Sequence, residues 1–160
     1  IKLIDLNQLI GEISETFGRT RRNITIHQEL TEGLFPVEAD QGQIEQALLN
    51  LMINASEAMP RGGELFLKTF NIRHKDIKDK ICNPKPGSYV LLTATDTGAG
   101  MDSKTLERIF DPFFTSKVYG PGLGLTFTLK IIQEHRGAIS VESEPGKGTT
   151  LTITLPLKRP

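Results

Sequence analysis

Residues 90–101 read Val-Leu-Leu-Thr-Ala-Thr-Asp-Thr-Gly-Ala-Gly-Met, an apolar run that leads into a carboxylate and two glycines. The aliphatic and β-branched residues predict a strand buried in a sheet. Taken alone, Asp96 followed by Gly98 and Gly100 is most simply an ordinary turn, because Asp and Gly both favour turns. The functional alternative is that the glycines let the backbone approach a flat ligand while Asp96 accepts a hydrogen bond from its amino group.

A long helix is predicted before this strand, from residue 41 to about Met59. Asp40 is the expected N-cap, and Gln43 completes a capping-box pattern. The helix should end before Pro60 and the Gly62-Gly63 pair. One apolar stripe faces the expected core and consists of Ile44, Leu48, Leu51 and Ala55.

The same helix carries polar residues that helix propensity does not favour. Asn50 and Asn54 lie one turn apart on a separate face, with Glu57 three residues further on. A solvated helix face explains the pair on its own. With further ligands nearby, an asparagine oxygen suits Mg²⁺, which prefers oxygen ligands and retains waters and phosphates. The pair therefore becomes a metal-site candidate only if other parts of the chain supply partners.

Residues 120–125, Gly-Pro-Gly-Leu-Gly-Leu, open another predicted helix that runs to about Arg136 and is closed by Gly137. Glycines at a helix N-terminus expose backbone N–H groups toward the positive end of the helix dipole, which suits phosphate. The motif is neither a P-loop nor a dinucleotide-binding fingerprint. Lys117, just upstream, is either a mobile cation for a terminal phosphate or an ordinary surface lysine.

The remaining pattern alternates helices and strands without a strict βαβ rhythm, which predicts an α+β fold with a helical layer on a mixed, mostly antiparallel sheet. Residues 75–87 form an expected solvated loop, and residues 111–122 an expected mobile loop. The other predicted elements are helices at 6–17 and 102–110 and strands at 24–30, 35–39, 64–70, 89–96, 138–143 and 149–155, with a hairpin turn at 144–148.

Composition excludes several classes of protein. The 160 residues carry 19 basic and 19 acidic side chains, so the net charge is zero, which argues against bulk nucleic-acid binding. No run of about 18 apolar residues predicts a membrane helix. One Cys and three His cannot build a disulfide framework or a structural zinc site. Without an N-terminal Met or leader, the chain is expected to be a segment of a longer protein.

Taken together, the motifs resemble those of sensor histidine kinases. Five stretches occur in the family's order over residues 40–156, and the variant resembles the nitrogen-regulator-type subgroup. The residues preceding them resemble the usual lead-in from the dimerisation domain. The corresponding boxes are N (50–59), G1 (96–101), F (109–114), G2 (120–125) and the final glycine-threonine motif (146–149).

The resemblance implies the Bergerat ATP-binding fold shared with gyrase, Hsp90 and MutL: a two-layer α/β sandwich whose sheet is covered on one face by about three helices, with a mobile ATP lid at 111–122. Residues 1–160 would form one catalytic domain, with 1–20 as the lead-in segment and first helix. The implied ligands are ATP or ADP and Mg²⁺. Asp96 would bind the adenine amino group with Thr149 nearby, Asn54 would ligate Mg²⁺ and Asn50 would line the phosphate site. The other nucleotide-binding residues implied are Gly98, Gly100, Met101, Lys117, Gly120, Gly122, Leu123, Gly124 and Leu125.

Position 50 favours phosphoryl transfer over hydrolysis. The related ATPases place a water-activating Glu one turn before the metal-binding Asn, whereas Asn50 is no base at neutral pH. The family's acceptor is a histidine on a dimerisation helix, and none of His27, His74 and His135 has that setting. Three alternatives stay open: a hydrolysing ATPase, a protein-serine kinase of the same fold, and a nucleotide-sensing module.

The resemblance also implies partners and a compartment. The phosphoryl group would pass to a dimerisation domain of the same parent kinase and then to a response-regulator receiver domain. The parent is expected to be a homodimer and the isolated domain a monomer, with no nucleic-acid partner. The expected compartment is the cytoplasm, with the parent free or membrane-anchored.

Overall fold

The computed structural model describes residues 1–73, 88–110, 115–116, 120–121 and 123–157. Its strands are β1 (Lys2–Ile4), β2 (Ile24–Glu29), β3 (Val37–Ala39), β4 (Gly63–Arg73), β5 (Ser88–Asp96), β6 (Thr115–Ser116), β7 (Gly120–Pro121), β8 (Ala138–Glu144) and β9 (Gly148–Pro156). Its helices are α1 (Leu6–Thr20), α2 (Gln41–Glu57), α4 (Ser103–Leu106) and α5 (Leu123–Glu134).

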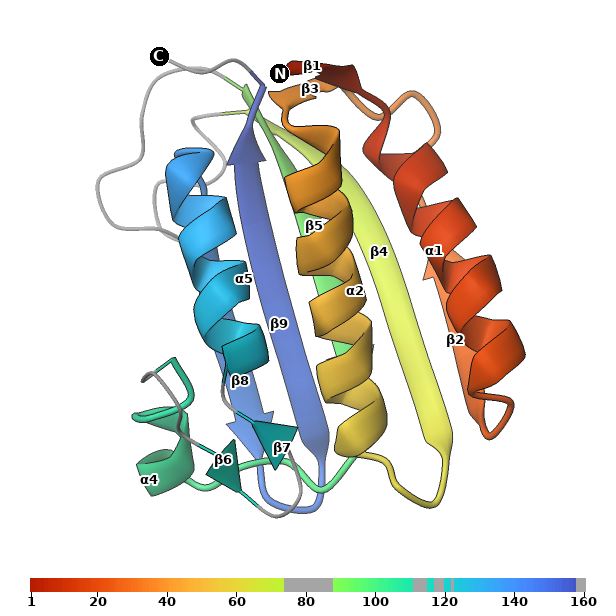
Figure 1. The fold of residues 1–160 in the computed structure, drawn as a ribbon, viewed down its shortest axis with the longest axis vertical. Coiled ribbons are helices and arrows are strands. Elements are labelled where there is room, and N and C mark those ends of the chain that lie inside the picture. The colour runs from red at the N-terminus through yellow and green to blue at the C-terminus, as the bar shows by residue number, and fades with distance from the viewer. Residues whose placement is uncertain (74–87, 111–114, 117–119, 122, 158–160) are drawn as a thin grey trace.

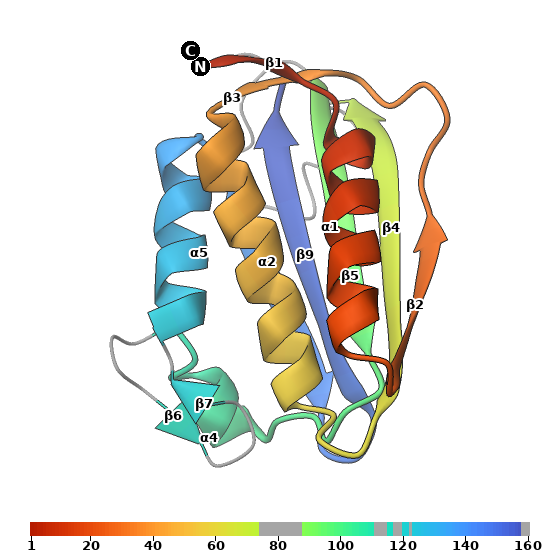
Figure 2. The same ribbon diagram turned by 45° about the vertical axis from the view of Figure 1, so that its right-hand side comes forward.

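The molecule has two layers, a five-stranded sheet and three helices on one of its faces (Figures 1 and 2). The strand order is β2-β4-β5-β9-β8, and only the pair β2–β4 is parallel. Helices α1, α2 and α5 lie side by side over the sheet in both views. The expected α+β sandwich, with a mostly antiparallel sheet covered on one face, is confirmed.

The core lies between these layers because the apolar stripes of the helices meet the inward side chains of alternate strand positions. On α2, the predicted stripe of Ile44, Leu48, Leu51 and Ala55 is buried. Helix α1 belongs to the same core through Leu6, Leu9, Ile10 and Phe17. The first 20 residues are therefore packed into the domain.

Both long N-terminal helices begin at an Asp. The Gln8 N–H donates to the Asp5 carboxylate, and the Gln43 N–H donates to the Asp40 carboxylate. The reciprocal half of the predicted capping box is absent among the described contacts of Asp40, because its own N–H donates to His135 Nε2 at 3.1 Å. His135 is buried, and its Nδ1 lies 2.8 Å from the Ile131 carbonyl. This histidine therefore joins the end of α5 to the start of α2.

Two predicted elements differ in extent from those observed. The helix expected over 102–110 is reduced to α4, Ser103–Leu106, followed by turns. None of the four residues of α4 is buried, so the core stabilises this short helix little, and the buried Ile109 lies in the turns that follow it. At the other end of the chain, β1 pairs with β3 in a small antiparallel sheet that the sequence pattern did not reveal.

Helix α5 ends in an unusual backbone conformation. Arg136 has φ 62°, the left-handed region that Gly favours, and the Gly137 N–H closes the helix on the Ile132 carbonyl at 2.9 Å. Over the part of the chain that the structure describes, no helix has the length and apolar character needed to cross a bilayer.

Candidate functional site

Three of the predicted motifs meet at the end of the molecule opposite both termini (Figure 1). Strand β5 ends there at Asp96, α2 ends there, and α5 begins there. The hairpin between β8 and β9 adds Thr149, which is the register partner of Asp96 on the neighbouring strand. Residues from four separate stretches of sequence are thus brought to one end of the sheet.

Asp96 is a buried carboxylate at this end, only 7% exposed. Its Oδ1 accepts the Gly98 N–H at 2.9 Å. Burial raises the pKa of Asp96, and the backbone N–H groups of Gly98 and Thr149 oppose that rise by stabilising the charged form. A carboxylate with few protein donors and little water can accept further hydrogen bonds from a ligand.

The two glycines after Asp96 have a packing role that the sequence prediction did not include. A Cβ at Gly98 would lie 2.5 Å from the Ala58 carbonyl oxygen. Gly100 has φ 71°, and a Cβ there would lie 1.9 Å from the Glu144 carbonyl oxygen. The glycines therefore let the loop lie against the end of α2 and against the β8–β9 hairpin. At these two positions it is the close approach of the loop to the protein's own backbone, and not to a ligand, that leaves no room for a Cβ.

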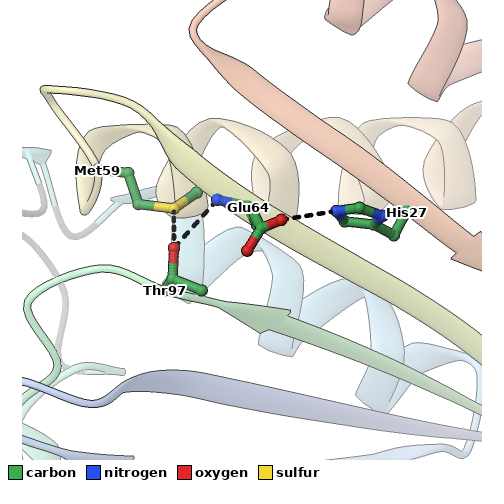
Figure 3. A network of polar contacts seen from close by, with 4 residues as sticks. All are labelled: His27, Met59, Glu64 and Thr97. Carbon is green, nitrogen blue, oxygen red and sulfur yellow. Dashed lines mark hydrogen bonds and ion pairs between the residues drawn. The ribbon is translucent and has the colours of Figure 1, made fainter.

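Thr97 fastens this loop to its neighbours, as Figure 3 shows. Its Oγ1 accepts the Glu64 N–H at 3.0 Å and lies 3.5 Å from Met59 Sδ, just beyond α2. Glu64 in turn lies 3.1 Å from His27 Nε2 on strand β2. Thr97, the residue after Asp96, is thus bonded both to β4 and to Met59 just beyond the end of α2.

Asn54 is the second unusual group at this end. It is 9% exposed, and its Nδ2 has no hydrogen-bond partner among the described residues. A solvated helix face, the simple explanation of the Asn pair, is therefore wrong for Asn54. Asn50 is half-buried, and its Oδ1 accepts from Gln46 Nε2 at 3.0 Å.

The unpartnered Nδ2 is a hydrogen-bond donor that suits an acceptor such as a phosphate oxygen, whereas the amide oxygen of Asn54 is the atom whose chemistry suits Mg²⁺. Within the described ranges, no group of three or more His, Cys, Asp or Glu could hold a metal ion. Burial raises the pKa of the Glu57 carboxyl, and the positive charge of Arg21 opposes that rise.

Ser143 was not predicted as a site residue from the sequence. Its hydroxyl makes three contacts at the β8–β9 hairpin. The Met101 N–H donates to Ser143 Oγ at 2.8 Å, and Ser143 Oγ donates to the Gly148 carbonyl at 3.0 Å. Its third contact is Thr149 Oγ1 at 2.7 Å. The signal that could have found Ser143 is the predicted turn at 144–148, since the residues flanking a hairpin turn face each other.

The other predicted site residues divide into two groups. Met101 is buried and lies in the loop after Asp96, while Gly120 lies in β7 and Leu123, Gly124 and Leu125 form the first turn of α5. Lys117 and Gly122 lie outside the described residues, as does most of the expected lid at 111–122. Among the described residues, the ends of α2 and β5, the start of α5 and Thr149 on β9 therefore lie at the same end of the sheet.

Comparison with known proteins agrees with this geometry. Residues 39–159 match the family described as Histidine kinase-, DNA gyrase B-, and HSP90-like ATPase. Sensor kinase CckA of Brucella abortus is 39% identical over 159 residues, which are 97% of this chain and 17% of CckA. The catalytic domain of histidine kinase ThkA is 31% identical with a TM-score of 0.79, and the match covers 99% of this chain and 98% of that domain.

Two further similar structures are complexes, one with AMPPNP and one with a response regulator. Full-length ShkA, in complex with AMPPNP, is 25% identical with a TM-score of 0.75, and the match covers 99% of this chain and 31% of ShkA. ThkA has also been solved with the response regulator TrrA. This chain belongs to the ATPase family that histidine kinases share with DNA gyrase B and HSP90. Its relatives within that family are sensor histidine kinases, and its fold is that of their catalytic domains.

Proposed function

We propose that this chain is the ATP-binding catalytic domain of a sensor histidine kinase. It would bind Mg-ATP and position the γ-phosphate for transfer to a histidine on a separate dimerisation domain, from which a response-regulator aspartate would receive it. The observation that carries the proposal is the buried Asp96 carboxylate, which is aligned with Thr149 at the same end of the sheet as Asn54, whose Nδ2 has no partner among the described residues.

Each residue has a role in this proposal. Asp96 accepts from the adenine amino group, with Thr149 beside it, and Asn54 ligates the Mg²⁺ carried by the phosphates. Mg²⁺ supplies charge neutralisation of the phosphates when it is bound. Asn50 lines the phosphate site, and the N-terminal turn of α5, with Gly124, offers backbone N–H groups to phosphate. Lys117 is proposed as the cation that reaches the terminal phosphate.

Phosphoryl transfer is favoured over hydrolysis by the environment of Asn50. An amide cannot take a proton from water at neutral pH, and this one already accepts from Gln46. A neutral imidazole needs less activation, since its pKa is about 6.5. No described histidine fits the acceptor: both ring nitrogens of His135 are engaged in its buried site, and the His27 ring is stacked on Phe66 at 4.6 Å. His74 lies outside the described residues.

Calorimetric titration with ADP and with a non-hydrolysable ATP analogue tests nucleotide binding. Replacing Asp96 by Asn turns one acceptor oxygen into a donor, and loss of a charge-assisted hydrogen bond should weaken binding by about 100-fold. Asp102→Asn is the matched control, because this exposed carboxylate only caps α4 and Asn caps equally well. The proposal is contradicted if the unmutated chain binds neither nucleotide, or if the Asp96→Asn variant binds as tightly as the unmutated chain.

A labelling experiment tests the transfer step. Incubated with radiolabelled ATP and Mg²⁺, the chain alone should acquire no stable acid-labile phosphate, whereas addition of the dimerisation domain of its parent kinase should produce phosphohistidine on that domain. Label retained on this chain would contradict a separate acceptor. In this proposal residues 1–160 form one catalytic domain with 111–122 as its lid, cytoplasmic because ATP is there, in a homodimeric parent.

A further inference from the structure

Three residues lie in a row across neighbouring strands at the candidate site. Ser143 on β8 is the register partner of Thr149 on β9, and Thr149 is the register partner of Asp96 on β5. Direct partners in antiparallel strands project from the same face of the sheet, about 5 Å apart at Cβ. All three therefore face the helical layer, on the side of the sheet where the buried Ile153 of β9 and Leu92 of β5 also lie.

The hydrogen-bond capacity of Ser143 decides the direction of each bond. A serine hydroxyl has one hydrogen to donate and two lone pairs that accept. The Gly148 carbonyl at 3.0 Å can only accept, so Ser143 donates its hydroxyl hydrogen in a bond to that carbonyl. The Met101 N–H at 2.8 Å can only donate, so it takes one lone pair. The remaining lone pair faces Thr149 Oγ1 at 2.7 Å, which must therefore donate its own hydrogen to Ser143.

The Thr149 hydroxyl is left with its lone pairs alone for any other partner. Beside it, Asp96 is an ionised carboxylate at neutral pH and also only accepts. Both groups are 7% exposed, so water compensates little for an unmatched ligand. Asp96 and Thr149 together therefore suit a ligand group that has two N–H hydrogens to donate. They disfavour a ligand group that places lone pairs at the same position.

We propose that Ser143 is a positioning residue that sets the base selectivity of this site by holding the Thr149 hydroxyl as an acceptor. This inference rests on the proposed nucleotide function. The site then takes purines with a 6-amino group, which offers two hydrogens, and rejects 6-oxo purines, whose oxygen would face two acceptors. Ser143 does not touch the ligand in this account: it acts through Thr149, and through Met101 it also holds the loop that carries Asp96.

The test is the ratio of affinities for ADP and inosine diphosphate, which exchange an amino for an oxo group at position 6. In Ser143→Ala, the Thr149 hydroxyl loses its acceptor and can rotate to donate to an oxo group. The ratio should then fall by about tenfold or more, mostly through tighter binding of inosine diphosphate. Ser143→Thr keeps the hydroxyl and should restore the parental ratio.

Thr150→Ala is the matched control. It removes a hydroxyl from the same strand, but one that pairs with Thr95 at 3.0 Å on the opposite face of the sheet, so the ratio should not change. If the unmutated chain prefers ADP and Ser143→Ala keeps the same affinity ratio, this inference is overturned and the proposed function stays intact. If the unmutated chain binds neither nucleotide, both are overturned.

A second pair of variants covers the case in which Ser143→Ala fails to fold. Thr149→Ser keeps the hydroxyl and should keep the ratio, whereas Thr149→Val removes it and should lower the ratio by about tenfold. Equal ratios in Thr149→Ser and Thr149→Val would show that the Thr149 hydroxyl does not discriminate, and the inference would then be wrong.

Discussion

Two polar clusters lie toward opposite ends of the sheet, and they differ in whether the protein alone satisfies them. The closed cluster consists of Asn7, Thr31 and Thr69. Asn7 Nδ2 donates to the Thr31 carbonyl at 2.8 Å, and Thr69 Oγ1 donates to Asn7 Oδ1 at 2.9 Å. The Thr31 N–H donates to Thr69 Oγ1 at 2.9 Å, and the Thr31 hydroxyl donates to the Thr69 carbonyl.

The open cluster consists of Asn54 and Asp96, which are both buried, and the protein does not satisfy it in the same way. Asn54 Nδ2 has no partner among the described residues, and burial of Asp96 raises its pKa. A buried polar group without a partner lowers stability, whereas a satisfied one is neutral or stabilising. The contrast is what the proposed function predicts, with the closed cluster stabilising the fold and the open cluster binding a ligand.

The largest expected effect is on the closed cluster. Thr69→Val removes the acceptor of the Thr31 N–H and the donor to Asn7, so two half-buried groups lose their partners. The free energy of unfolding should fall by about 2–4 kcal/mol, measured by urea denaturation, while the ADP affinity of the folded protein stays unchanged. Thr69→Ser keeps the hydroxyl and should recover most of the loss. A change in ADP affinity would contradict the separation of the two clusters.

Asn54→Ala should give the opposite pattern. The variant removes an amide whose Nδ2 has no partner among the described residues, so the free energy of unfolding without ligand should change by less than about 1 kcal/mol. Affinity for an ATP analogue in the presence of Mg²⁺ should fall by about tenfold or more, with a smaller loss when EDTA is present.

Ser14→Ala is its control, since the buried Ser14 Oγ on α1 also lacks a partner in the described structure but lies away from the site. That variant should be as stable as the parent or more so, with unchanged nucleotide affinity. If Asn54→Ala destabilised the fold as much as Thr69→Val, Asn54 would belong to the scaffold.

The pH dependence of stability sharpens the comparison. Because burial raises the pKa of Asp96 above 3.8, the folded state holds this proton more tightly than the unfolded chain does. The contribution to stability is therefore full below that value and is lost as the pH rises through the folded pKa. Asp96→Asn should be more stable than the parent at pH 7, and the difference should shrink as the pH falls toward 4, measured by denaturation at several pH values. A gap independent of pH would contradict this account.

The smallest expected effect lies at the far end of α5. Arg136 is exposed and has φ 62°, which costs a non-Gly residue about 1 kcal/mol. Arg136→Gly should raise the free energy of unfolding by about that amount, seen as a higher melting temperature, without changing nucleotide affinity. Arg136→Ala keeps a Cβ and should give no gain. Equal gains in both variants would attribute the effect to the lost charge.

Much of the fold was predictable because it depends on local pattern. The apolar stripe of α2 with its Asp40 cap, the apolar run of β5 and the irregular order of helices and strands predicted the helical layer and the mostly antiparallel sheet. The short α4 and the β1–β3 pair were not predictable in the same way, since neither depends on its own periodicity. What stabilises or limits them is packing against distant residues.

For the site, the sequence by itself determined which chemistry is present: Asp96 at the end of a strand, two asparagines one turn apart, and glycines before a helix. Only the tertiary structure decided how these groups behave. It buried Asn54 with its Nδ2 lacking a partner among the described residues, packed Gly98 and Gly100 against protein backbone, and placed Ser143 Oγ in contact with Thr149 Oγ1. Residue types fix which groups can donate or accept, but burial and register decide which of them are still free to bind a ligand.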